Sequence, residues 1–407
     1  MGAIGEVSVF RPCMVVEAEP VGLRPRPLYG DPYADAGELI KRLVEHGGRL
    51  SPFFAATVHE RRHFHDLFLS NSAVFDLLNA ASIVGNGVQL SIVASRNGGH
   101  DATPLLAKDR VSGEWVPNPE KSWSEADRRE IGRILKAANQ LGRGFHPSLE
   151  WIAFSSEFYP FVELGLLRPD GSGDSELLSD EFIYRWRGFL KVAERTGGFE
   201  RSFAVHNIIA LFNLSGRIEL DAAVLSTMTA GELHSLMKTE LLLSYRELNR
   251  WLREQVSAFS ELYQPFWEER PVSDGWSLIE LLRFVVDYRD AFAARVEDEP
   301  EIVTDIERWH RWMANEAVKV PIYVKFARPL ELETEITENY MVSKWLSHPF
   351  NTQFFIYMDG FGRSYEPFGI RAWDFHIQWS YFVYHLVFVG LKSPELWRSS
   401  LWAFAEK

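Results

Sequence analysis

Apolar residues recur at helical spacing through most of this chain. The spacing predicts helices over residues 35–45, 51–69, 71–83, 124–141, 147–164, 179–196, 203–214, 229–260, 277–296 and 303–318. Residues 1–30 instead alternate apolar and polar positions among Pro and Gly, which predicts short strands and extended loops. Further strand patterns lie at residues 88–95 and 321–336. We therefore expect a mainly α protein with minor β structure, an α+β fold.

The same pattern divides the chain into three regions. Residues 1–165 hold the N-terminal strands and the first helices, residues 166–296 are helical, and residues 297–407 are rich in aromatic side chains. The acidic stretch at 296–301 is the clearest boundary, and one compact unit is the alternative to separate domains. A loop rich in Gly, Pro and Asn at residues 97–122 is expected to form a lid or a rim.

One predicted helix carries a motif with chemical meaning. His59, Glu60 and His63 form His-Glu-x-x-His, and residues four apart on a helix share a face, so both imidazoles can bind one metal ion. The residues before the motif are apolar, which indicates that the helix enters the protein interior. The alternative is a pair of core or surface histidines, with Arg61 and Arg62 on the solvent-exposed face.

Composition narrows the function classes. The chain has 407 residues, 46% hydrophobic residues and a net charge of −13, which is typical of a soluble globular protein and disfavours nucleic acid as a partner. A single cysteine, Cys13, excludes a cysteine-based metal cluster, so a metal would need imidazole and carboxylate ligands. No signal segment or membrane-spanning run is visible, and we expect a cytoplasmic protein without a membrane partner.

A catalytic zinc ion usually takes three protein ligands, so the motif needs a third. Asp66 shares the helical face of His59 and His63, but one straight helix cannot easily supply all three ligands. Asp66 is better suited to orient an imidazole by accepting from its free N–H. The metzincin spacing is absent, because Asp66 stands where that class has Gly and Leu69 where it has the third ligand.

A second segment, residues 146–157, places Glu150 three residues before Ala153 on an apolar helix. Together the two helices, residues 51–70 and 147–164, resemble the gluzincin branch of the zinc peptidases. The resemblance implies a zincin-like core, a bound Zn²⁺, a peptide or protein substrate, His59, His63 and Glu150 as ligands, and Glu60 as the general base.

Physical chemistry leaves two interpretations of Glu150 open. A carboxylate on an otherwise apolar helix is costly unless it is paired or bound to a cation, but an acid in the first helical turn is also favoured by the helix dipole. Glu157 lies on the same face two turns later, where it could support the site or form a salt bridge. Gluzincins also use a downstream Tyr or His for the oxyanion, and the candidates are Tyr159, His206 and Tyr245.

Two other classes stay open. The same motif is described in peptide-modifying oxygenases that use Fe²⁺ with 2-oxoglutarate, where Arg201 or Arg217 would bind the cosubstrate carboxylate. The third class is a non-enzymatic binding or scaffold protein with a vestigial motif, whose aromatic C-terminal region (residues 350–382) forms a partner surface or, more commonly, core.

Overall fold

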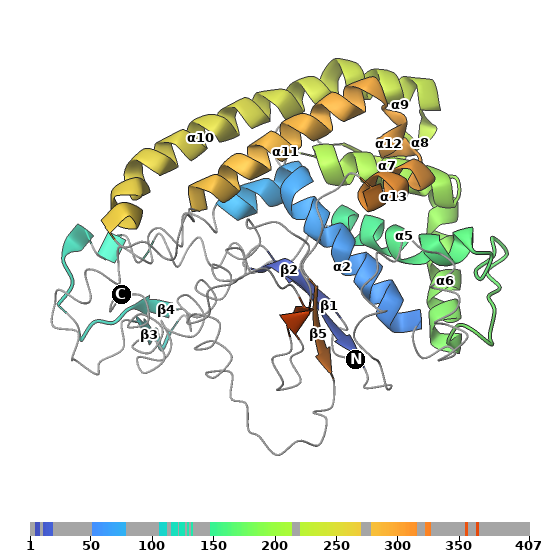
Figure 1. The fold of residues 1–407 in the computed structure, drawn as a ribbon, viewed down its shortest axis with the longest axis horizontal. Helices are drawn as coiled ribbons and strands as arrows, with labels where there is room; N and C mark the ends of the chain where they lie inside the picture. The colour runs from blue at the N-terminus through green and yellow to red at the C-terminus, as the bar shows by residue number, and fades with distance from the viewer. Residues whose placement is uncertain are drawn as a thin grey trace.

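Helix α2 (Ser51–Leu69) lies between a small sheet and several other helices in the computed structural model of this protein (Figure 1). The structure describes residues 5–8, 11–18, 51–78, 106–111, 115–120, 122–126, 128–129, 132, 147–213, 220–269, 278–315, 322–326, 355–356 and 364–365. These residues are mostly helical, as the hydrophobic pattern predicts.

The labelled helices after α2 all lie between residues 147 and 315. They are α5 (Pro147–Glu163), α6 (Asp180–Ala193), α7 (Phe199–Phe212), α8 (Ala222–Thr227), α9 (Ala230–Leu236), α10 (Leu242–Glu269), α11 (Leu278–Asp298), α12 (Glu301–Thr304) and α13 (Ile306–Asn315). A 3₁₀ turn, η2 (Glu194–Thr196), follows α6, and a π-helical turn, η3 (Met237–Leu241), joins α9 to α10.

The described strands are short. They are β1 (Gly5–Ser8), β2 (Arg11–Ala18), β3 (Leu106–Lys108), β4 (Trp115–Pro117), β5 (Ile322–Phe326), β6 (Phe355–Ile356) and β7 (Ser364–Tyr365). Strands β1 and β2 pair antiparallel, and β2 pairs with β5 in parallel, from Met14 opposite Ile322 to Ala18 opposite Phe326. The pairs β3–β4 and β6–β7 are antiparallel.

Several boundaries agree with the sequence pattern. The motif helix begins at Ser51 and ends at Leu69, and α5 begins at Pro147, a residue well suited to the first helical turn. The predicted loop at 97–122 contains the β3–β4 pair, which its turn-rich composition did not indicate. The helix predicted at 35–45 and the strand predicted at 88–95 lie outside the described residues, as does most of the C-terminal aromatic region.

One hydrophobic core joins the three predicted regions. It contains Leu69 and Leu149, helix α7 residues such as Phe203, and Trp309 of α13, all fully or almost fully buried. Helix α2 packs against α5, α7 and α11 on one side and against β1 and β2 on the other. Because the core is shared, the position of α2 depends on residues from across the chain.

Helix α2 is buried on every side over its second half. Every residue from 60 to 71 is buried, and Arg61 and Arg62 are only 5% and 0% exposed. The alternative interpretation that placed these two arginines on a solvent-exposed face is therefore wrong. Polar groups on a helix buried all round must find partners inside the protein, since an unpaired buried charge is costly.

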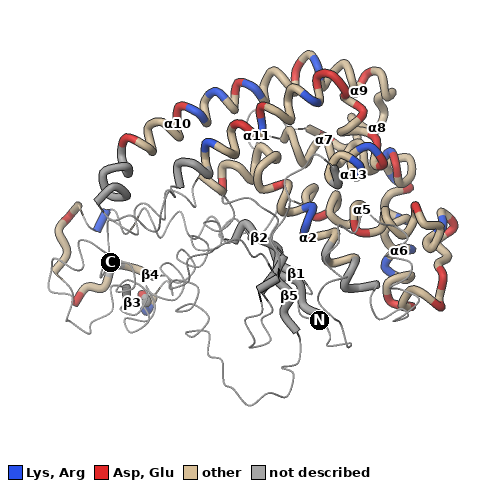
Figure 2. The backbone as a smooth tube through the Cα atoms, viewed as in Figure 1, with Lys and Arg blue, Asp and Glu red and all other residues tan. Residues whose placement is uncertain are grey.

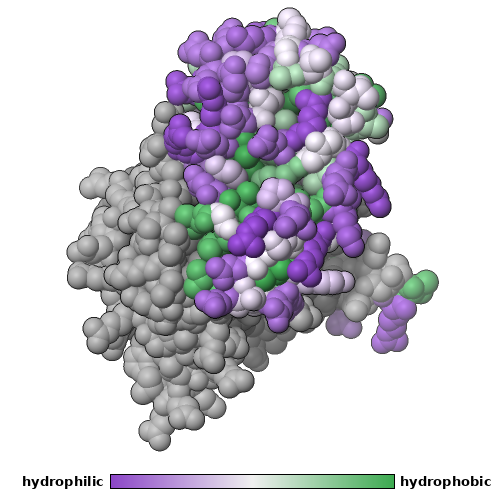
Figure 3. Space-filling view, turned by 90° about the vertical axis from the view of Figure 1, so that its right-hand side faces the viewer, coloured by the Kyte–Doolittle hydropathy of each residue, from purple (hydrophilic) through white to green (hydrophobic). Residues whose placement is uncertain are grey.

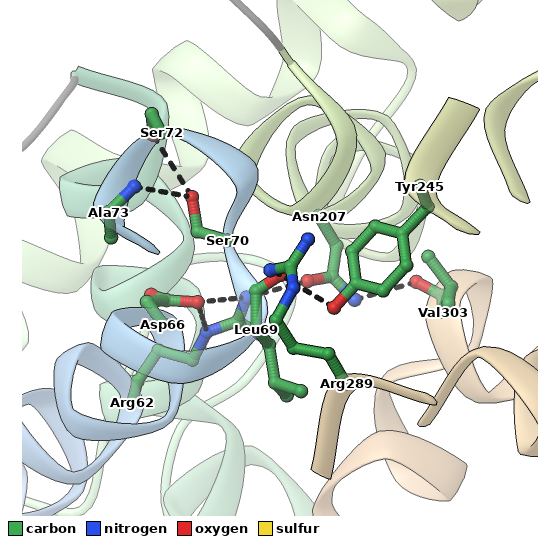
Figure 4. A network of polar contacts seen from close by, with 10 residues as sticks. All are labelled: Arg62, Asp66, Leu69, Ser70, Ser72, Ala73, Asn207, Tyr245, Arg289 and Val303. Carbon is green, nitrogen blue, oxygen red and sulfur yellow. Dashed lines mark hydrogen bonds and ion pairs between the residues drawn. The ribbon is translucent and has the colours of Figure 1, made fainter. Parts of the chain in front are cut away.

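Arg62 finds its partners within the helix layer (Figure 4). Its Nε and Nη2 donate to Asp66 Oδ1 at 2.9 and 2.8 Å, and Nη2 also donates to Asn207 of α7 at 2.7 Å. Asn207 in turn donates to the carbonyl of Val303 at 2.8 Å, and the Trp309 ring lies against the guanidinium. This chain of contacts fixes the rotation of α2 against α7 and α12.

Arg289 of α11 performs a similar task at the C-terminal end of α2. Arg289 donates to the Leu69 carbonyl at 2.7 Å, and Tyr245 donates to the same carbonyl at 2.8 Å (Figure 4). Arg289 also donates to Asn71 at 2.6 Å. The last carbonyls of a helix have no partner within the helix, so these bonds satisfy groups that burial would otherwise leave unpaired.

Charges of both signs are distributed along α10 and around α6 and α13 (Figure 2). The face in Figure 3 is largely hydrophilic, with hydrophobic residues in its middle. Within the described part of the chain, no helix has the length and apolar character that a membrane crossing requires.

Candidate metal centre

His59, His63 and Glu150 converge at the contact between α2 and α5. The two Nε2 atoms are 3.1 Å apart, and each lies 3.5 Å from Glu150 Oε2. His63 is buried, the His59 side chain is 12% exposed and that of Glu150 is 44% exposed. The triad therefore lies at the edge of the interior and is open to solvent on the side of Glu150.

The local sequence explains this convergence. His59 and His63 are one helical turn apart on α2, so their imidazoles project from the same face. On α5, Glu150, Phe154 and Glu157 follow the spacing i, i+4, i+7 and form one stripe. All three contact His59: the two carboxylates at 3.5 and 3.3 Å, and the Phe154 ring at 4.9 Å between centroids.

The spacing of the three atoms fits a metal ion. Bonds of about 2.0–2.1 Å to tetrahedrally arranged ligands place those ligands about 3.3–3.4 Å apart. The observed separations of 3.1, 3.5 and 3.5 Å bracket that value. Two imidazoles and one carboxylate are also a donor set that zinc and iron both accept. These three residues could therefore hold a metal ion.

The charges of the triad are strongly coupled. Burial lowers the pKa of His59, but hydrogen bonds with Glu150 and Glu157 outweigh it and raise that pKa to about 9. Burial lowers the pKa of His63. Glu150 contacts both imidazoles, and these contacts hold the pKa of its carboxyl well below the usual range. Without a metal, the geometry thus favours a protonated His59 beside a neutral His63. A metal would displace that proton, because imidazole binds metals only when neutral.

Glu60 accompanies the triad on α2. It is 7% exposed, and its negative charge contributes to the raised pKa of His59. A buried carboxylate next to a metal ligand is a suitable proton acceptor for metal-bound water. The structure therefore brings together His59, His63 and Glu150, and Glu60 acts on this group through its charge.

Glu157 contacts the ring nitrogen of His59 that does not face His63 and Glu150. Its Oε2 is 3.3 Å from His59 Nδ1, the ring nitrogen that does not face the triad, and its side chain is 2% exposed. Arg185 of α6 binds the same carboxylate, with Nη2 at 2.8 Å from Oε1 and 3.1 Å from Oε2. Glu157 therefore combines the two roles considered from the sequence, because it contacts His59 and forms a salt bridge with Arg185.

Asp66 and the three proposed oxyanion donors have other partners. Asp66 is fully buried and pairs with Arg62, and its charge also acts on His63. Tyr159 stacks on His310 of α13 at 4.4 Å between centroids, and Tyr245 donates to Leu69. His206 contacts the Trp151 ring, and burial lowers its pKa to about 4. None of Tyr159, His206 and Tyr245 has a described contact with the triad.

The two arginines considered for a cosubstrate are also accounted for. Arg201 donates to the backbone carbonyls of Leu225 and Met228, which holds α8 against α7. Arg217 lies outside the described residues. Arg185 instead reaches the surroundings of the triad, through its ion pair with Glu157.

Sequence reasoning missed Phe154 and Arg185. The position of Phe154 four residues after Glu150 could have identified it, because that spacing places both side chains on one face of α5. No local signal distinguishes Arg185 from its exposed neighbour Arg187, since its relation to the site depends on how α6 packs against α5.

Comparisons with protein families, with curated proteins and with solved structures gave no match to this chain.

Proposed function

We propose that this protein is a zinc-dependent peptide-bond hydrolase with a gluzincin-like site. The observation that carries the proposal is the close approach of three ligand atoms, from His59, His63 and Glu150, with edges of 3.1–3.5 Å. The helix pair α2–α5 beside the β1–β2–β5 sheet supports a zincin-like core.

The chain's own residues supply the parts that such a reaction needs. His59, His63 and Glu150 would hold Zn²⁺, which polarises a carbonyl and lowers the pKa of bound water. Glu60 accepts the proton of the attacking water and delivers it to the leaving amine. Glu150 is the most exposed of the triad, and we therefore place substrate entry on its side of the site.

An iron-dependent oxygenase is the second candidate, because the same donor set also suits iron. Two histidines and one carboxylate also form the facial triad of non-haem Fe²⁺ oxygenases. The hydrolase remains the better proposal for two reasons. Glu60 has a defined role only in hydrolysis, and Arg201 is bound to backbone carbonyls instead of facing the triad.

Glu60→Gln separates catalysis from metal binding. We expect this variant to keep its zinc and its fold but to lose peptide cleavage by 100-fold or more, about the contribution of a general base. The measurement is turnover of a fluorogenic peptide mixture by zinc-loaded wild type and variant. Equal turnover by the two proteins would contradict the role of Glu60, and turnover of 2-oxoglutarate by the iron-loaded protein would favour the oxygenase.

A further inference from the structure

The carboxylate of Glu157 lies between His59 and Arg185, two residues from different helices. It approaches His59 Nδ1 at 3.3 Å with one oxygen and Arg185 Nη2 at 2.8 Å with the other. Glu157 is 2% exposed, whereas the Arg185 side chain is 38% exposed. The three groups thus form a line from the candidate metal centre on α2, through α5, to the surface at α6.

His59 and Arg185 interact with the Glu157 carboxylate in different ways. A buried carboxylate is unfavourable without a cation, and Arg185 is the cation that binds Glu157. An ionised Glu157, 3.3 Å from His59 Nδ1, can in turn accept a hydrogen bond from Nδ1–H, which leaves Nε2 as the unprotonated nitrogen facing His63 and Glu150. Hydrogen bonds of this kind orient metal-binding imidazoles and increase their basicity.

Contacts at the N-terminus of helix α6 and directly after Arg185 hold this part of the helix in place. Ser179 caps the helix by accepting from the backbone N–H of Phe182. The next residue after Arg185, Trp186, is buried and donates to the Arg168 carbonyl at 2.9 Å. Arg185 also lies over the Phe154 ring, 5.6 Å from its centroid, and that ring contacts His59. The guanidinium is therefore positioned by its helix as well as by its ion pair.

We propose that Arg185 is a positioning residue of the metal centre, acting through Glu157 on the His59 ring. This inference rests on the proposed metal site and adds a residue that neither the motif nor the resemblance contains. It assigns α6 a role in the site, because any displacement of Arg185 reaches His59 through one shared carboxylate.

A purely structural salt bridge would behave differently. It would lower the stability of the metal-free protein when removed, but it would leave the affinity for zinc unchanged among molecules that remain folded. The positioning role predicts a loss of zinc affinity, and it also predicts that Glu157 and Arg185 act as one unit. Zinc affinity and its coupling between the two positions are thus the readouts that distinguish the roles.

The experiment measures the zinc dissociation constant by competition with a chromogenic chelator. The proteins are wild type, Glu157→Gln, Arg185→Ala, Arg185→Lys and the double variant Glu157→Gln/Arg185→Ala. Arg187→Ala is the matched control, since Arg187 is an exposed arginine of the same helix that donates to the Gly171 carbonyl. Thermal unfolding of each metal-free protein reports on the fold.

We expect Glu157→Gln and Arg185→Ala each to weaken zinc binding by about tenfold or more, the usual effect of losing such a supporting contact. The double variant should bind zinc no more weakly than the more strongly affected single variant, because the two residues act in series. Arg185→Lys should recover part of the affinity, and Arg187→Ala should match wild type.

Two contrary results have different meanings. If wild type binds zinc and Arg185→Ala binds it equally tightly, or if the two single losses simply add, the positioning role is overturned while the metal centre stands. If wild type itself binds no zinc, the proposed function fails and this inference fails with it.

Discussion

At the scale of single residues, His59 joins the candidate centre to its surroundings. Its Nε2 faces His63 and Glu150, and its Nδ1 faces Glu157. Both carboxylates stabilise the charged form of this imidazole, and the pKa of His59 therefore rises to about 9 in spite of burial. The same arrangement suits a metal ion, which would replace the proton on Nε2.

This coupling predicts how the stability of the metal-free protein depends on pH. The pKa of His59 is higher in the folded state, about 9, than its ordinary value of 6.5, so protonated His59 stabilises the fold fully below pH 6.5. That contribution, up to about 3 kcal/mol, is lost as the pH rises through 9. Urea unfolding of wild type and His59→Gln should show a stability difference that shrinks between pH 6.5 and 9.5. A difference independent of pH would contradict the coupling.

The residues of the triad were accessible to sequence reasoning to different degrees. Helical spacing alone predicted that His59 and His63 share a face, and the structure has their Nε2 atoms 3.1 Å apart. Glu150 was identified by resemblance and by the cost of a carboxylate on an apolar helix. Arg185 could not be found, since an arginine on an amphipathic helix carries no sign of the carboxylate that it will meet on another helix.

At the scale of elements, the candidate metal centre depends on the fixed rotation and position of α2. The helix start at Ser51-Pro52 and its end at Leu69 were visible in the sequence. The partners that hold it were not, because Asn207 and Arg289 are 145 and 218 residues away from the groups they bind. Such long-range contacts are selected by packing, and a local pattern does not contain them.

Arg289→Ala tests the C-terminal anchor of α2. The substitution removes one of two donors to the Leu69 carbonyl, leaving that of Tyr245, and removes the donor to Asn71 Oδ1, both in the protein interior. We expect a loss of about 3 kcal/mol or more in the free energy of unfolding, together with weaker zinc binding. Denaturant unfolding monitored by circular dichroism gives the first value.

The control for this variant is Arg246→Ala. Arg246 pairs with Glu297 on the surface, where both side chains are more than 40% exposed, and such pairs contribute about 0–1 kcal/mol. If Arg289→Ala proved as stable as Arg246→Ala, the anchor would not be what holds α2.

At the scale of the whole molecule, residues from all three predicted regions share one hydrophobic core. The mainly helical character followed from apolar periodicity and is confirmed for the described residues. The sharing of the core did not follow from it, since periodicity shows which face of a helix is apolar but not which helix will cover that face. The site lies where this core meets solvent, between α2 and α5.

A metal bound at such a place should stabilise the whole fold, because the unfolded chain cannot hold the triad together. Free zinc at 100 times its dissociation constant should add about 2.7 kcal/mol to the free energy of unfolding. Thermal unfolding with zinc and with a chelator measures this directly. His63→Ala should remove the response to zinc; a response that survives in this variant would place the stabilising ion elsewhere.

Elemental analysis of the purified protein decides whether His59, His63 and Glu150 form one metal site. We expect one equivalent of zinc per chain in wild type and in Glu60→Gln, and its loss in His59→Ala, His63→Ala and Glu150→Ala. A folded wild-type protein that retains no metal after incubation with zinc, or an equal zinc content in Glu150→Ala, would contradict this site.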